Sequence, residues 1–178
     1  MDFSEEELKA FRLKLESDRK ENAMWNEKEN EYKKLYDQGK LKIEVRWKDN
    51  WSDLDFKYLE TAFAEDFLED LLENFTVMKL DLNKVLVKHC GNQKEANKTY
   101  PTKRLWDSDI GRSDRKMTKI LEFLKNGQTL SPPVIDINEN DVILWYDGNH
   151  RAALARYLGC VNIPFLVRKS NIDRLTNL

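Results

Sequence analysis

The stretch from residue 142 to residue 159 constrains the fold of this chain more than any other. Residues 142–145 are apolar, an Asp147-Gly148 pair follows, and helical spacing then continues as far as Gly159. Apolar β-branched and aromatic residues favour a strand, whereas aspartate and glycine mark a turn. We therefore predict a strand that bends at Gly148 into a helix, with Asn149 as the N-cap and Gly159 at the helix end.

The start of this helix is a candidate site for an anion. Glycine lets the backbone approach a ligand closely, and the N–H groups of a first helical turn have no intrahelical acceptor. Together with His150 and Arg151 they would point at one spot, which is what a phosphate or carboxylate requires. An ordinary strand–turn–helix connection has the same pattern, so the residues alone leave both interpretations open.

Motifs on both sides of this stretch carry a resemblance to a known family. Residues 126–134 read NGQTLSPPV, residues 147–153 read DGNHRAA, and residues 163–164 read IP after a Leu-Gly pair. This order of motifs and elements resembles the ParB/sulfiredoxin-like domain family over residues 78–169. The resemblance implies an α+β fold, in which helices pack on a small mixed sheet. Because function belongs to sites and not to folds, the site residues need their own argument.

The resemblance also implies where phosphates would be bound. In ParB-like domains, the entrance of the helix before the Pro-Pro strand carries basic residues that face the same phosphates as the glycine turn. Arg112, Arg115 and Lys116 occupy that position here. With Gly148 and Asn149, they are the residues that we expect to bind ATP or another nucleotide.

Departures from the family's patterns narrow the function that the resemblance implies. Sulfiredoxins carry a cysteine just before the His-Arg pair, where this chain has Asn149, which argues against sulfinic-acid repair. Partition ParB proteins place a helix-turn-helix DNA reader after this domain, whereas only a few residues follow Val167 here. Those proteins also carry a Glu-Arg-Arg type sequence where this chain has Asn-His-Arg, which weakens the case for cytidine triphosphate. The sequence is most similar to the stand-alone branch, which includes a free serine kinase, nucleases and ATPases of mobile elements.

The candidate catalytic groups are His150, Arg151 and the two carboxylates Asp109 and Asp147. Phosphoryl transfer needs mainly positioning and charge compensation, so cationic side chains around a helix start would suffice for it. Either aspartate could hold Mg²⁺ or accept a proton. Asp147 also has a plainer interpretation, because a carboxylate beside a helix start often only satisfies backbone donors.

Residues 1–75 are predicted to be an N-terminal helical extension of a ParB/sulfiredoxin-like domain at 76–178. Residues 4–37 are rich in Glu, Lys and Arg and contain neither Pro nor Gly, and Ser4 with Glu7 forms a capping-box signature. One long helix or two shorter ones fit this pattern.

Two more elements are predicted within the extension. Residues 41–47 alternate between apolar and charged, which is the period of a half-buried strand. A helix is predicted from Ser52 or Asp53 to Asn74, with a strongly acidic outer face. Such a face is usually a solvated surface, but it could also dock a partner protein, as could the N-terminal helices.

The remaining chain alternates strands with helices around one long connection. Strands are predicted at 76–87, 134–137, 142–145 and 163–167, a helix at 113–125, and a short tail after 167. Residues 88–112 show little regular pattern and mix basic residues with Tyr100 and Trp106. Basic and aromatic side chains together can hold a nucleotide. A mobile basic surface loop explains the same composition.

Bulk properties exclude several classes of protein. The 178 residues carry a formal net charge of −2, which does not favour binding of nucleic acid by the whole chain. The start is acidic and no apolar run is long enough to span a bilayer, so we expect a cytoplasmic protein without a membrane partner. Cys90, Cys160, His89 and His150 do not stand at zinc-site spacing, so no structural metal is expected.

Three hypotheses follow from these observations. The first is a nucleotide-dependent enzyme, an ATPase or small-molecule kinase that uses Mg²⁺. The second is a nuclease or DNA-binding factor of a mobile element, favoured by the basic residues around 94–119 and disfavoured by the net charge. The third is a non-catalytic interaction module whose helices dock a partner protein.

Overall fold

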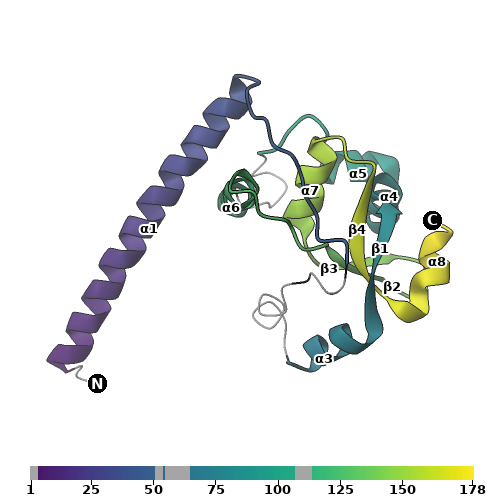
Figure 1. The fold of residues 1–178 in the computed structure, drawn as a ribbon, viewed down its shortest axis with the longest axis horizontal. Helices are drawn as coiled ribbons and strands as arrows, with labels where there is room; N and C mark the ends of the chain where they lie inside the picture. The colour runs from purple at the N-terminus through teal and green to yellow at the C-terminus, as the bar shows by residue number, and fades with distance from the viewer. Residues whose placement is uncertain (1–3, 51–53, 55–64, 107–113) are drawn as a thin grey trace.

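The computed structural model describes residues 4–50, 54, 65–106 and 114–178. A long helix lies beside a body in which strands and shorter helices pack together (Figure 1). The long helix, α1 (Glu5–Asp37), is one continuous element, and its predicted capping box is confirmed. The backbone N–H of Glu7 donates to Ser4 Oγ at 3.3 Å, and the backbone N–H of Ser4 donates to Glu7 Oε2 at 2.7 Å.

The body is built on a four-stranded mixed sheet. Its strands are β1 (Phe75–Asp81), β2 (Val134–Ile137), β3 (Ile143–Asp147) and β4 (Asn162–Arg168). The order is β1-β4-β2-β3, with β4 antiparallel to β1 and parallel to β2, and with β2 antiparallel to β3. The predicted α+β class, with a mixed sheet and an N-terminal helix, is therefore confirmed. Residues 163–167 of β4 are all buried, because helices cover one face of the sheet and a second cluster covers the other.

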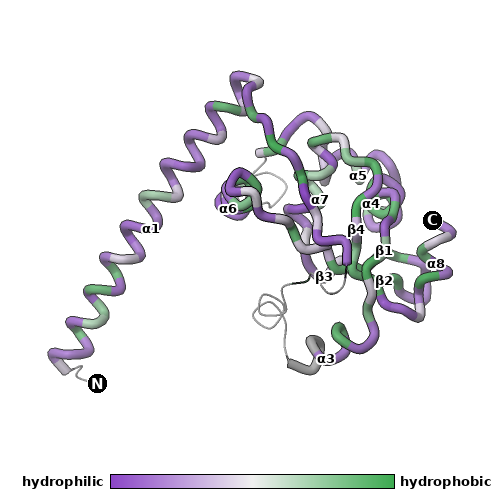
Figure 2. Tube along the Cα trace, in the orientation of Figure 1, coloured by the Kyte–Doolittle hydropathy of each residue, from purple (hydrophilic) through white to green (hydrophobic). Residues whose placement is uncertain are grey.

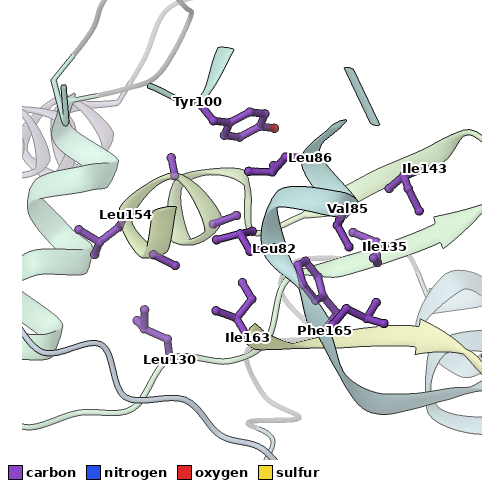
Figure 3. Close-up of a cluster of buried hydrophobic side chains, with 14 of the residues drawn as sticks. Leu82, Val85, Leu86, Tyr100, Leu130, Ile135, Ile143, Leu154, Ile163 and Phe165 are labelled. Atoms are coloured by element: carbon purple, nitrogen blue, oxygen red, sulfur yellow. The ribbon is translucent and has the colours of Figure 1, made fainter. Parts of the chain in front are cut away.

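Four helices supply most of the helical residues of the larger core, which lies on one face of the sheet. They are α4 (Leu82–Cys90), α5 (Gln93–Thr99), α6 (Asp114–Lys125) and α7 (Asn149–Tyr157). Figure 3 shows members of this core, among them Leu82 and Leu86 of α4, Leu154 of α7, and Ile135 and Phe165 of the sheet. Burial of these apolar side chains is the main stabilising term of the body.

The opposite face of the sheet carries a smaller cluster. Leu71 of α3 (Glu65–Asn74) packs there with Phe75, Val134 and Leu166. An ionic network joins the same layers, because the guanidinium of Arg168 donates to both oxygens of Asp70 at 2.9 and 2.6 Å and to Asp136 Oδ2 at 2.9 Å. Asp70 belongs to the acidic face predicted for a partner protein, and in the structure it serves to hold α3 on the sheet.

The C-terminal half of α1 packs against α6. The hydroxyl of Tyr32, which is 1% exposed, donates to Glu122 Oε2 at 2.8 Å, and Lys33 Nζ lies 2.7 Å from Asp114 Oδ2. Figure 2 shows that α1 is largely hydrophilic, with scattered hydrophobic positions toward its N-terminus. None of the described helices has the length and apolar character needed to cross a membrane.

Two predicted segments of the body are only partly correct. The strand expected at 76–87 ends at Asp81, whose side chain accepts the backbone N–H of Lys84 at 3.0 Å and caps α4. Val85 and Val87 are therefore helical. The connection expected at 88–112 contains α5, which begins where Asn92 Oδ1 accepts the backbone N–H of Glu95 at 2.9 Å.

The strand predicted at 41–47 does not form a ladder. Its exposure alternates as expected, but its pairing is a single parallel bridge between Trp47 and Leu130. Lys48 N donates to Leu130 O at 2.9 Å, and Leu130 N donates to Arg46 O at 2.8 Å. The segment therefore runs beside residue 130 as extended chain.

Other boundaries differ in detail. The predicted tail forms η3 (Lys169–Asn171) and α8 (Ile172–Thr176), and the helix predicted to end at residue 74 is described only as α3. The predicted start of that helix, at Ser52 or Asp53, lies outside the described residues.

Candidate functional site

A cleft of about 380 Å³ opens where α6 faces the start of α7. It brings together six of the predicted site residues: Lys116, Asp147, Gly148, Asn149, His150 and Arg151. The other lining residues are Lys48, Lys119, Ile120, Phe123, Thr129, Leu130 and Ser131. The strand-to-helix corner and the helix before the Pro-Pro strand thus line one cleft, with Lys116 as the predicted basic residue of that helix that reaches it.

Gly148 makes the corner possible. Its φ is +89°, in the left-handed region that side-chain-bearing residues rarely adopt. A Cβ added there would lie 2.6 Å from Pro133 Cα, 2.7 Å from Pro133 Cβ and 2.9 Å from Arg151 Nη2. Both the backbone conformation and the close approach of Pro133, which precedes β2, therefore require glycine.

The predicted N-cap is wrong by one residue. Gly148 is the N-cap of α7, and within the described chain no side chain makes the capping hydrogen bond. Asn149 is the first helical residue, and its Oδ1 accepts the hydroxyl hydrogen of Tyr100. Because Tyr100 is buried at the end of α5, this contact fixes the start of α7 to the core.

Arg151 and Asp147 form an ion pair across the corner. The guanidinium donates to Asp147 Oδ2, and the Arg151 side chain is 10% exposed while that of Asp147 is 32% exposed. The pair ties the end of β3 to the first turn of α7. Arg151 therefore helps to hold the corner in place. A metal ion or proton bound at Asp147 would have to share the carboxylate with the Arg151 guanidinium.

Two lysines that the sequence reasoning missed also line the cleft. Lys48 reaches it from the extended segment beside Leu130, and Lys119 reaches it from α6. Lys119 Nζ lies 3.8 Å from Glu21 Oε1 and 5.1 Å from the ring centre of Trp25, both on α1. The spacing of Lys116, Lys119 and Phe123 on one helical face was a usable signal, whereas nothing local pointed to Lys48.

Arg115 is not part of the cleft. Its guanidinium turns to α1, where Nη1 donates to Asn22 Oδ1 at 3.3 Å and Nη2 donates to Asn26 Oδ1 at 2.5 Å. The Arg115 side chain therefore packs on α1 and does not line the cleft, contrary to the predicted phosphate-binding position. Arg112 and Asp109 lie outside the described residues.

The lining has a clear electrostatic and chemical bias. Among the described lining residues, Lys48, Lys116, Lys119 and Arg151 are cationic and Asp147 is the one carboxylate, although Lys119 also lies 3.8 Å from Glu21 of α1. The positive end of the α7 dipole adds to this excess. Phe123, 43% exposed, supplies an aromatic surface next to Ile120 and Leu130. Such a cleft suits an anion that also carries an apolar or planar group.

Cysteine and histidine clusters do not add a metal site to this description. In the described ranges, no group of three or more His, Cys, Asp or Glu side chains is placed to hold a metal ion. His89 Nδ1 lies 2.9 Å from Ile143 O, and burial raises the pKa of the Cys90 and Cys160 thiols.

Comparison of the chain with protein-family models, with curated proteins and with solved structures found no match. The site is therefore interpreted from its own geometry and charge.

Proposed function

We propose that this protein binds a nucleotide in the cleft between α6 and α7 and acts on its phosphates. One observation supports this most directly: Lys116 and Lys119 of α6 and Lys48, which is distant from them in the sequence, line the same cleft as the glycine corner of α7. Bringing like charges together costs free energy, which an anionic ligand would offset.

The cleft has a polar and an apolar side, which suggests an orientation for the nucleotide. The phosphates lie toward the three lysines and the N-terminus of α7, where charge and helix dipole act in the same direction. The base lies against Phe123 and Ile120, because a planar ring can stack on an exposed aromatic side chain.

The lining residues fit a Mg²⁺ ion that arrives with the nucleotide. Mg²⁺ is usually held by phosphates and one or two carboxylates, and Asp147 supplies a carboxylate here. When bound, the ion would offset charge on the phosphates during transfer or hydrolysis. His150 lines the same space and is the group that we propose to move a proton. The ParB/sulfiredoxin-like resemblance supports this choice of chemistry, namely ATP hydrolysis or phosphoryl transfer to a small molecule.

Calorimetric titration of ATP, ADP, CTP and GTP, each with and without Mg²⁺, tests the proposal. Lys116→Ala and Lys48→Ala each remove a charged contact, worth about 1.5–3 kcal/mol, so we expect Kd to rise roughly ten- to a hundredfold. The matched control is Lys94→Ala at an exposed position of α5, which leaves Kd unchanged. Equal affinity in all these proteins would contradict the proposal.

A mobility-shift assay separates this function from the nuclease or DNA-binding alternative. Binding of DNA through phosphates falls steeply with salt concentration, and a nucleotide pocket alone gives no shift of duplex DNA even at low salt. A shift that Lys116→Ala abolishes would favour the alternative.

A further inference from the structure

The N-terminal half of α1 carries apolar side chains that the body does not cover. Each of residues 4–24 is exposed, and Leu8, Phe11 and Leu15 are 42%, 61% and 39% exposed. Their spacing of three and four residues places them on one face of the helix. Figure 1 shows this half of α1 extending away from the sheet and its helices.

The same face is covered further along the helix. Continuing the heptad spacing from Leu8, Phe11 and Leu15 leads to Asn22 and Tyr32, which contact Arg115 and Glu122 of α6. One continuous stripe of α1 is therefore occupied by a helix at its C-terminal end and exposed at its N-terminal end. A second helix would prolong an interface that already exists.

Charges beside the exposed stripe indicate which helix would fit there. Glu5 and Arg12 lie on one flank of the stripe, and Glu7 and Lys14 lie on the other. In an antiparallel pair of these helices, Leu8 of one copy packs against Phe11 of the other. Glu5 then faces Arg12 and Glu7 faces Lys14, each twice because of the two-fold symmetry.

Other arrangements of two copies are less favourable. A parallel pair in register places Asp18 opposite Asp18 and Lys14 opposite Arg19. An antiparallel pair shifted by one heptad places Arg12 opposite Arg12. Like charges at these positions are destabilising, so the first antiparallel arrangement is selected by charge as well as by apolar contact.

We propose that the N-terminal half of α1 docks on a second copy of this chain as an antiparallel helix pair. The overlap covers residues 4–15, about 18 Å of helix at 1.5 Å per residue. It stops before Glu21 and Asn22, where α6 begins to contact α1, so the two bodies lie at opposite ends of the pair. So short an interface buries less surface than a stable dimer, and the association is weak and depends on concentration.

Sedimentation equilibrium of the full chain without nucleotide, over a hundredfold range of concentration, tests this pairing. Wild type shifts from monomer to dimer as the concentration rises. Glu5→Lys alone and Arg12→Glu alone remain monomeric, because each places like charges opposite one another in its own homodimer. An equimolar mixture of the two variants dimerises, because the lysine introduced at position 5 faces the glutamate introduced at position 12, and the unchanged Arg12 faces the unchanged Glu5.

Glu6→Lys is the matched control. It makes the same charge change in the first turn of α1 and therefore has the same cost against the helix dipole, but residue 6 points away from the stripe. Glu6→Lys dimerises like wild type. Glu7 is left unchanged in these variants because its carboxylate also holds the Ser4 cap.

Several outcomes would overturn the proposal. They are a wild-type chain that stays monomeric throughout, a mixture of Glu5→Lys and Arg12→Glu that stays monomeric, and variants that dimerise as well as wild type. A Phe11→Ser chain that still dimerises would also overturn it, because Phe11 is the largest apolar side chain of the stripe. Since nucleotide is absent, the result does not depend on the proposed function of the cleft.

Discussion

Replacing Gly148 by alanine tests whether the corner of the cleft is built as described. An L-residue at φ +89° costs about 1–2 kcal/mol relative to its relaxed conformation. The new Cβ would also lie within 3.0 Å of the Pro133 backbone and of Arg151 Nη2, and forcing an extra carbon into a packed site costs about 1–3 kcal/mol more. We therefore expect the free energy of unfolding to fall by about 2–5 kcal/mol.

Gly159→Ala is the matched control at the other end of the same helix. Gly159 has φ +76°, and a Cβ there would meet no described atom within 4 Å. Gly159→Ala therefore includes the cost of a positive φ and the effect of alanine on the unfolded state, but it does not include a steric clash. Gly148→Ala should therefore be about 1–3 kcal/mol more destabilising than Gly159→Ala.

Urea unfolding followed by tryptophan fluorescence measures both variants. An unchanged slope with a lower midpoint would show that stability alone has changed. Equal loss in the two variants would refute the close approach of Pro133 to Gly148, because strain in the backbone conformation would then account for the whole effect.

Two further predictions concern polar groups outside the cleft. The buried guanidinium of Arg156 donates to Ala96 O at 2.9 Å and to Asn97 Oδ1 at 2.6 Å. Arg156→Lys cannot reach both acceptors and should destabilise the protein in urea by about 1.5–3 kcal/mol, and an unchanged midpoint would contradict this bridging role. Hydrogen bonds from Arg168 hold the pKa of Asp70 below its ordinary value. The folded pKa is the lower one, so this stabilisation is present above the unfolded pKa and is lost as pH falls through the folded value. Asp70→Asn should therefore lower the free energy of unfolding at neutral pH but not in strong acid, and a loss that persists in strong acid would disprove the linkage.

The corner at Gly148 was predictable because its signals are local. An apolar run, an Asp-Gly pair and a helical pattern all lie within residues 142–159, and each has a short-range physical cause. The N-cap was misplaced because Asn149, which is an excellent cap by composition, bonds to Tyr100 instead. That partner is distant in the sequence, and propensity carries no information about it.

Tertiary packing determines the features of the fold and site that could not be predicted from the sequence. Arg115 and Lys116 are adjacent in the sequence and carry the same charge, yet the Arg115 side chain contacts α1 whereas Lys116 lines the cleft. Lys48 enters the site only because its segment runs beside Leu130. The alternating residues 41–47 predicted a strand, but a strand also needs a partner strand, and this segment runs beside residue 130, outside the four-stranded sheet, where a single bridge forms.

The most direct test of the central claim is amide chemical-shift mapping by NMR as ATP with Mg²⁺ is added to the protein. Nucleotide phosphates in the cleft should shift the amide signals of residues 147–151 and of Lys116 and Lys119 first and most strongly. Adenosine, which lacks phosphates, should leave those signals in place. Saturating ATP that leaves residues 147–151 unshifted, or that shifts only a different surface, would contradict the account.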